Sequence, residues 1–249
     1  MAKNQFSSLK IDKWDSAFFK AKIVRMKISG AARSRNLSKE LPGLIERAER
    51  AGVNFLVVKI EGKNASYEKA LLGLDFKICG ENVGLVFKYP GHLNAIVNTG
   101  YKIRFLKPAD RRKACVIASD AFRLSYLYRC GFSKRAEVDR YHYVWAQNLS
   151  KDKHSQVFVA KRGGRVAGFI ALTLNRRKEY ARIVLVAVQK RFRGLGIGKG
   201  LVRESIRWYS GKVKTIYVKT QSNNHKALHL YSSMGFRPFE HEKIYCKKL

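Results

Sequence analysis

The sequence has few acidic residues, few prolines and few cysteines, and it lacks long apolar runs. Only 18 Asp and Glu oppose 51 Lys and Arg in 249 residues, so the formal net charge is +33, which excludes an acidic, halophile-type surface. Four prolines, 46% hydrophobic residues and 12% aromatic residues exclude a disordered tail and indicate folded cores. The length fits one large or two small domains.

Segments that would mark export or membrane insertion are also missing. The opening MAKNQFSSLK has no apolar stretch of the signal-peptide type. The longest aliphatic run, Ile183 to Val188, is much shorter than the roughly 20 residues that cross a bilayer. The four cysteines form no C-x-x-C pair. We therefore expect a cytoplasmic protein with reduced thiols and no membrane association.

The positive charge lies mainly in the second part of the chain. Residues 1–100 carry a net charge of +8, whereas residues 101–249 carry +25. Such a field attracts anionic ligands and phosphates, so this part is expected to meet an anion. A basic bias of the whole proteome is the alternative explanation.

Hydrophobic periodicity in the second part predicts alternating strands and helices, which is typical of an α/β fold with a mixed sheet. The strongest hairpin signal is the turn Gly163-Gly164. The expected strands cover 101–106, both arms of that hairpin, 181–188 and 215–219. The expected helices follow Pro108, cover about 137–148, contain Leu201 to Trp208, and run from Asn224 to near Gly235.

A glycine loop, QKRFRGLGIGKG, follows the predicted strand 181–188 and leads into an amphipathic helix. Because its glycines lack Cβ atoms, backbone N–H groups from 194 to 199 can close on a phosphate, and the helix N-terminus adds its positive dipole end. A tight turn is the structural alternative. The loop does not fit G-x-x-x-x-G-K-[ST], and no acidic residue follows about 20 positions on, which disfavours NTP hydrolysis and dinucleotide redox chemistry.

Three linked motifs resemble the acetyl-CoA core of the GCN5-related N-acetyltransferases (GNAT). They are Val186-Ala187-Val188, the R-x-x-G-x-G that begins at Arg193, and N-x-x-A-x-x-x-Y-x-x-x-G-F from Asn224 to Phe236. The resemblance covers residues 101–249. It implies a GNAT fold with a splayed central sheet, acetyl-CoA as the cosubstrate and no metal.

The resemblance also implies a role for each site residue. Tyr231 would protonate the departing thiolate, because a phenol with a pKa of about 10 can return a proton to a thiol of about 8.5 when the two are held close. Leu185 stands where the family often has a carboxylate base. No general base is therefore evident, which favours an amine already neutral near pH 7, such as one on a sugar ring. The expected cofactor-binding residues are Val186, Ala187, Val188, Arg193, Gly194, Leu195, Gly196, Ile197, Gly198, Lys199 and Asn224.

The first hundred residues contain a degenerate copy of the second part. Shifted by 160 positions without a gap, residues 21–88 match residues 181–248 at 13 of 68 positions, where roughly 4 are expected by chance. Tyr231 becomes Leu71, and the three loop glycines become Ser34, Asn36 and Ser38, so the copy should not hold a pyrophosphate. We predict a degenerate half-GNAT domain over 1–98 and a catalytic GNAT domain over 99–249.

Two further stretches are similar to the dTDP-fucosamine (dTDP-4-amino-4,6-dideoxygalactose) acetyltransferases. They are W-D-S-x-F-F from Trp14 to Phe19, and AFRLSYLYRCGF through VDRYHYVWAQN. Lys20 departs from the glycine that this subfamily commonly has there. The likeness implies direct acetyl transfer to the amine of a small anionic acceptor, a nucleotide-linked amino sugar.

Other interpretations of these motifs stay open. One is acetylation of a protein or aminoacyl-tRNA amine, and another is a basic RNA-binding module on a GNAT fold, which the basic runs at 111–113 and 190–193 suggest. The intact glycine loop, Asn224 and Tyr231 argue against a binding-only protein, so nucleic acid is not favoured as a partner. His225 and His229 lie one helical turn apart without a third ligand nearby in sequence, so no metal site is predicted.

Overall fold

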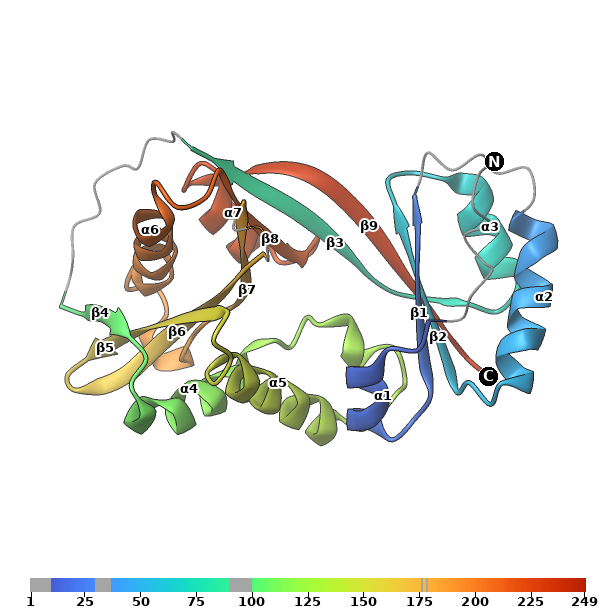
Figure 1. Ribbon diagram of the computed structural model, residues 1–249, viewed down its shortest axis with the longest axis horizontal. Helices are drawn as coiled ribbons and strands as arrows, with labels where there is room; N and C mark the ends of the chain where they lie inside the picture. Colours follow the sequence, from blue (N-terminus) through green and yellow to red (C-terminus); the bar gives the residue numbers. More distant parts are fainter. Residues whose placement is uncertain (1–9, 30–36, 90–99, 176, 178) are drawn as a thin grey trace. The chain divides into compact units, whose positions relative to one another are not determined.

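The computed structural model describes residues 10–29, 37–89, 100–175, 177 and 179–249, and Figure 1 shows its elements. The chain forms two compact units. Unit 1 comprises residues 1–82, 125–137 and 240–249, and unit 2 comprises 83–124 and 138–239. The predicted domain boundary, between 98 and 99, lies outside the described residues, so that division stays a prediction.

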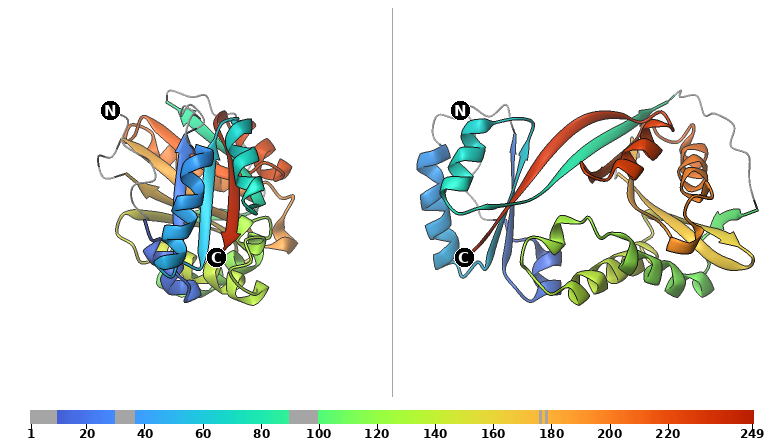
Figure 2. Two further views of the ribbon diagram at one scale, coloured as in Figure 1. Left: turned by 90° about the vertical axis from the view of Figure 1, so that its right-hand side faces the viewer. Right: turned by 180° about the vertical axis from the view of Figure 1, so that it is seen from behind.

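Unit 1 is built on the first copy of the repeat. Strand β1 runs parallel to β2, and β9 runs antiparallel to β2. Helices α2 and α3 lie on one side of β1 and β2 and α1 on the other (Figure 2), and the core forms between the strands and α2 and α3. Its elements are α1 (Lys13–Phe19), β1 (Ile23–Ser29), α2 (Leu37–Arg50), β2 (Phe55–Glu61), α3 (Ala65–Gly73), the 3-10 helix η2 (Tyr126–Tyr128) and parts of β3 (Lys77–Lys88) and β9 (Arg237–Lys248).

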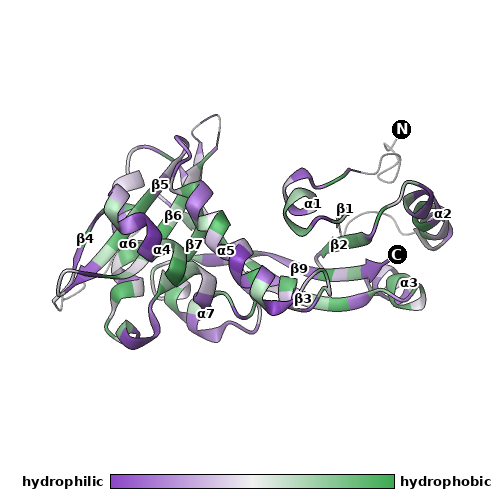
Figure 3. Cartoon of the chain, turned by 90° about the horizontal axis from the view of Figure 1, so that it is seen from below, coloured by the Kyte–Doolittle hydropathy of each residue, from purple (hydrophilic) through white to green (hydrophobic). Residues whose placement is uncertain are grey.

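Unit 2 contains a mixed sheet with the strand order β3-β8-β7-β6-β5-β4. Helices α6 and α7 contribute to one core and α4 and α5 to a second core, and the strands between them, β6 and β7, are mostly hydrophobic (Figure 3). Its elements are β4 (Lys102–Phe105), α4 (Pro108–Ala121), α5 (Arg135–Leu149, which begins in unit 1), β5 (Ser155–Arg162), β6 (Arg165–Leu174), β7 (Tyr180–Val188), the 3-10 helix η3 (Lys190–Phe192), α6 (Ile197–Tyr209), β8 (Thr215–Gln221) and α7 (His225–Ser232).

This order of elements confirms the predicted α/β class and the GNAT fold, with a half-GNAT copy in the first part. The copy is visible in the element bounds, which repeat at the shift of 160 residues found in the sequence. Strand β2, Phe55–Glu61, corresponds to β8, Thr215–Gln221, and β3 corresponds in the same way to β9. None of the described helices is both long and apolar enough to cross a membrane.

The two copies differ in how far their parallel strands pair. β1 pairs with β2 along all seven residues, from Ile23 opposite Phe55 to Ser29 opposite Glu61. β7 pairs with β8 only from Tyr180 to Ile183, although its pairing with β6 continues to Val188. In the described part of unit 2, the second half of β7 therefore keeps a backbone edge that β8 does not use. This is the splay that the family resemblance implied, and the copy in unit 1 has closed it.

The structure corrects the expectation that all cysteines are reduced. Cys130 and Cys246 form a disulfide across 116 residues of sequence, whereas Cys79 and Cys115 are free and buried. The fold brings the segment 125–137 and the end of β9 into the same unit. Because the two cysteines become neighbours only in the folded chain, no rule of sequence spacing could have paired them.

Candidate active site

The open edge of β7 carries the predicted residues Val186, Ala187 and Val188. Ala187 is buried, and the two valines are half-buried against the core that contains α6 and α7. The Nε of Arg193 donates a hydrogen bond to the carbonyl oxygen of Val188 at 3.1 Å, so Arg193 ties the glycine loop to the end of the strand. The edge is thus fixed in place, with backbone groups that an extended ligand can pair with.

Sequence reasoning missed Gly168, which supports this edge from β6. A Cβ at position 168 would lie 2.7 Å from the carbonyl oxygen of Ala187, so only glycine allows β6 to approach β7 here. The available signal was an isolated glycine within a strand pattern, which often marks a close backbone approach.

The glycine loop turns directly into α6. Gly194 and Gly196 have φ values of +82° and +70°, in the left-handed region that favours glycine. Gly196 is the N-cap of α6 and offers no side-chain hydrogen bond, so the first N–H groups of the helix keep their donors for a ligand. Ile197 is buried and anchors the first turn, while Leu195 and Lys199 are half-buried. The loop therefore fits an anion such as a pyrophosphate.

Gly198 occupies the first turn of α6, where β7, α6 and α7 meet. A Cβ at this position would lie 3.7 Å from Leu230 and 3.9 Å from Val188, which is ordinary van der Waals contact. The protein itself therefore does not require glycine at position 198. The close approach of acetyl-CoA to the backbone at Gly198 stays a prediction.

Gly200 has a different reason to be glycine. A Cβ there would lie 2.4 Å from the hydroxyl of Tyr101 and 2.9 Å from its ring. We expect Gly200→Ala to lower the stability of the chain by about 1–3 kcal/mol, the usual cost of overpacking a core. Urea unfolding followed by circular dichroism measures this. Adding Tyr101→Phe should restore part of the loss, and an unchanged stability of Gly200→Ala would contradict the close packing.

Asn224 is the N-cap of α7. Its Oδ1 accepts a hydrogen bond from the backbone N–H of Ala227 at 3.3 Å, and its Nδ2 donates to Oγ1 of Thr220 at 3.1 Å. Asn64 caps α3 at the same place in the first copy, where its Oδ1 accepts from the N–H of Tyr67 at 3.2 Å. In the structure Asn224 therefore acts as a helix cap, and its contact with the pantetheine region stays a prediction.

The two asparagines make a matched pair for an experiment. Asn64→Ala and Asn224→Ala should each cost about 0.5–2 kcal/mol of stability, because each removes a helix cap. Only Asn224→Ala should also weaken acetyl-CoA binding, measured by calorimetry. Equal affinity of both variants would leave Asn224 as a cap alone.

Tyr231 lies on α7, next to Leu230. Its side chain is 2% exposed, and its ring centroid is 5.4 Å from that of Phe236. Burial raises the pKa of the Tyr231 phenol well above its ordinary value, so the hydroxyl stays protonated at neutral pH. That is the form a proton donor needs. The corresponding Leu71 is fully buried in unit 1 and has no proton that it could donate.

Leu185 is 2% exposed and belongs to the core formed with α4 and α5. The position where the family often has a carboxylate thus holds a packing residue.

A cavity of about 610 Å³ opens beside β4, where Arg104 and Lys161 contribute to its lining. Asp110 forms ion pairs with both cations, and although burial raises the pKa of Asp110, hydrogen bonds from Lys161 and Arg104 lower it below its ordinary value. The cavity contains none of the predicted site residues.

Comparison with known proteins bears on this site. The family model described as Acetyltransferase (GNAT) family matches residues 121–236. A spore coat polysaccharide biosynthesis protein of Bacillus subtilis, SpsD, is 29% identical over 131 residues, which are 52% of this chain and 45% of that protein. The N-alpha-acetyltransferase RimI of Mycobacterium tuberculosis is 30% identical over 86 residues, which are 34% of this chain and 53% of that protein. The chain thus spans about half the length of these curated relatives.

A solved structure resembles most of the fold. A tandem GNAT protein from the clavulanic acid biosynthesis pathway matches 92% of this chain and 75% of its own length, with a TM-score of 0.58 and 14% identity. At that identity the likeness concerns the fold alone, and a tandem protein agrees with the repeat found here. The chain thus has a GNAT fold, and its residues 121–236 are similar to the GNAT acetyltransferase family.

Proposed function

We propose that the chain is an acetyl-CoA-dependent N-acetyltransferase that transfers acetyl directly to an acceptor amine. The observation that carries this proposal is the unpaired edge of β7 beside the uncapped start of α6. An extended pantetheine arm can pair with the backbone of Val186 to Val188, while the N–H groups of 194–199 hold the pyrophosphate. The copy in unit 1 lacks this edge and serves as an internal contrast.

The residues of the site have different roles in the reaction. Acetyl-CoA, when bound, supplies an acetyl group that is activated as a thioester. The backbone of β7 orients the bound arm, and Arg193 holds the strand end through the Val188 carbonyl. The hydroxyl of Tyr231 donates its proton toward the departing sulfur. Because burial that raises the pKa of the phenol also raises that of a thiol in the same desolvated site, the proton transfer stays feasible.

The acceptor that we propose is an amino sugar linked to a nucleotide. The net charge of +25 over residues 101–249 attracts a diphosphate. Leu185 offers no base, which suits an amine that is already neutral near pH 7. The similarity to a spore coat polysaccharide biosynthesis protein supports the same acceptor class.

A protein amine is the second candidate. It is favoured by the similarity to an N-alpha-acetyltransferase over 86 residues. The amino group at a protein N-terminus has a pKa of about 8, so it also needs little help from a base. Aminoacyl-tRNA belongs to the same group of acceptors, because its reactive group is an α-amine.

The test is to incubate the protein with acetyl-CoA and separate acceptors while the release of free thiol is followed. The acceptors are dTDP- and UDP-amino sugars, peptides with free N-termini, and charged tRNA. Turnover on a nucleotide amino sugar supports the proposed acceptor. Turnover only on peptides or tRNA keeps the acetyltransferase and rejects the sugar. Failure to bind acetyl-CoA, or RNA binding without it, rejects the enzyme.

A further inference from the structure

Unit 1 contains a cluster of three cysteines that the acetyltransferase site does not use. Cys79 lies on β3, Cys130 in the segment 125–137, and Cys246 on β9. The three Sγ atoms lie within 4.8 Å of one another, and Cys130 and Cys246 form the disulfide. The exposed fractions of Cys79, Cys130 and Cys246 are only 2%, 7% and 4%. A free thiol is thus confined next to a disulfide.

Hydrogen bonds and charges hold Cys79 in this position. Its Sγ lies 3.5 Å from the carbonyl oxygen of Lys77 and 3.7 Å from that of Arg129, and its single S–H can donate a weak hydrogen bond to either of them. Burial raises the pKa of the Cys79 thiol to about 11, while the backbone of Cys246 and the charges of Arg129 and Lys77 oppose that rise. At neutral pH it is therefore a thiol, and a small fraction is the reactive thiolate.

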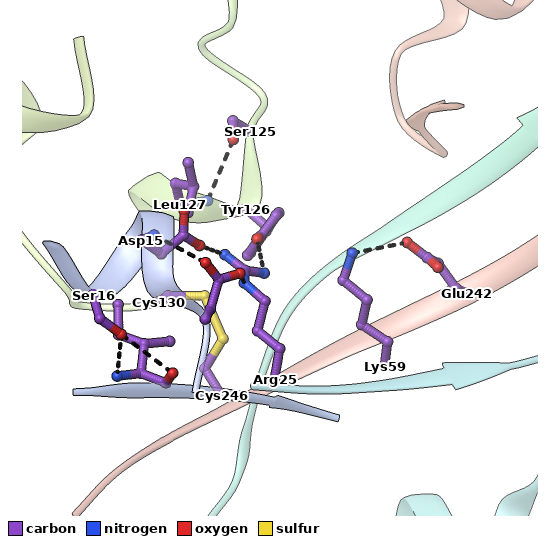
Figure 4. A network of polar contacts seen from close by, with 12 residues as sticks. Asp15, Ser16, Arg25, Lys59, Ser125, Tyr126, Leu127, Cys130, Glu242 and Cys246 are labelled. Carbon is purple, nitrogen blue, oxygen red and sulfur yellow. Dashed lines mark hydrogen bonds and ion pairs between the residues drawn. A yellow bond between two sulfur atoms is a disulfide. The ribbon is translucent and has the colours of Figure 1, made fainter. Parts of the chain in front are cut away.

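Noncovalent contacts fix the segment 125–137 on unit 1 independently of the disulfide. The guanidinium of Arg25 donates to the hydroxyl of Tyr126 and pairs with Asp15 (Figure 4). The ring centroid of Phe132 lies 5.7 Å from that of Phe19 and 4.9 Å from that of Phe55. The segment should therefore stay in place when a sulfur bond moves.

We propose that the cluster is a thiol–disulfide exchange site, in which Cys79 can replace either partner of the Cys130–Cys246 bond. In one direction the Cys79 thiolate attacks Sγ of Cys130. The Cys79–Cys130 bond forms, the Cys130–Cys246 bond breaks, and Cys246 leaves as a thiolate that takes up the proton Cys79 lost. The number of disulfides is unchanged, so no external oxidant or reductant is needed.

Each of the three pairings connects different segments. The Cys130–Cys246 bond ties the segment 125–137 to β9, whereas a Cys79–Cys246 bond would tie β3 to β9 and leave that segment without a covalent link. A Cys79–Cys130 bond would release β9 instead. The exchange would thus determine whether β3 is covalently bonded to the segment 125–137 or to β9.

The experiment maps the disulfides in the full chain. Wild-type protein is incubated without reductant between pH 7 and 10, quenched with acid, alkylated with N-ethylmaleimide and digested for mass spectrometry. We expect peptides joined through Cys79 to accumulate beside the Cys130–Cys246 pair. Their rate should rise about tenfold per pH unit, because the thiolate fraction of Cys79 does so below its pKa.

Single variants provide the second arm, with oxidised glutathione as the electron acceptor. Cys130→Ser should form Cys79–Cys246, and Cys246→Ser should form Cys79–Cys130. Cys79→Ser should retain only the native pair, and Cys115→Ser, which removes the free thiol of the other unit, should behave like wild type. Absence of Cys79 from every disulfide of the wild-type chain overturns the proposal, as does equal participation of Cys115. The wild-type arm decides even where a variant fails to fold.

Discussion

Tyr231→Phe should lower the turnover of acetyl transfer by about 100-fold to 10,000-fold, the usual contribution of a positioned acid. The change removes one oxygen from a side chain that is 2% exposed and keeps the ring that packs on Phe236. Acetyl-CoA affinity should therefore stay close to wild type. Steady-state kinetics together with calorimetry separate the two quantities. Since burial raises the pKa of Tyr231, loss of its proton should not limit the rate below about pH 10.

Tyr209→Phe is the matched control. Tyr209 lies on α6 in the same core, it is 5% exposed, and burial raises the pKa of its phenol as well. Its substitution removes the same atom from outside the site, so turnover should be unchanged. If both variants lost activity equally, the effect would come from the core. If Tyr231→Phe kept full turnover, Tyr231 would not be the proton donor.

Gly198→Ala should separate binding from stability. The added methyl group meets Leu230 and Val188 only at ordinary contact distance, so the fold accommodates it. Replacing a helical glycine by alanine should leave stability unchanged or raise it by up to about 1 kcal/mol. The same methyl group would take up space that the proposed pyrophosphate site needs for its ligand. Acetyl-CoA affinity should fall about 10- to 100-fold, which corresponds to the loss of one charge-assisted hydrogen bond of about 1.5–3 kcal/mol.

Gly43→Ala on α2 controls for the effect on the helix. A Cβ there would meet only the guanidinium of Arg47 at 3.9 Å, in unit 1. This variant should gain similar stability with unchanged acetyl-CoA affinity in calorimetry. A stabilised Gly198→Ala that still binds acetyl-CoA like wild type would mean that the loop is a turn and not a pyrophosphate site.

Much of the fold could be predicted because it depends on local patterns. The apolar run of β7, the Gly163-Gly164 turn and the cap at Asn224 each specify structure within a few residues, and the structure places strand, turn and cap there. The repeat allowed elements of the first part to be predicted from those of the second, because an unbroken shift of 160 residues keeps the helices and strands of both copies in register.

What the sequence could not show depends on contacts between distant residues. Glycine occupies positions 194, 196, 198 and 200. Only the structure reveals that Gly200 makes room for Tyr101, whereas a Cβ at Gly198 would make only ordinary van der Waals contact. The pairing of β1 with β2 along its whole length is likewise not revealed by the composition of β1. In the first copy, Ser34 and Asn36 and the side chain of Ser38 lie outside what the structure describes.

The membership of β9 in unit 1 sets the order in which the nascent chain can fold. β2 pairs with β9, from Phe55 opposite Lys248 to Glu61 opposite Glu242, so the two strands leave the ribosome roughly 180–190 residues apart. At a synthesis rate of about 5–20 residues per second, β9 emerges roughly 10–40 s after β2. During that time the edge of β2 that later pairs with β9 is open to pairing with other chains. The part of the chain that is synthesised first is thus the last to be completed.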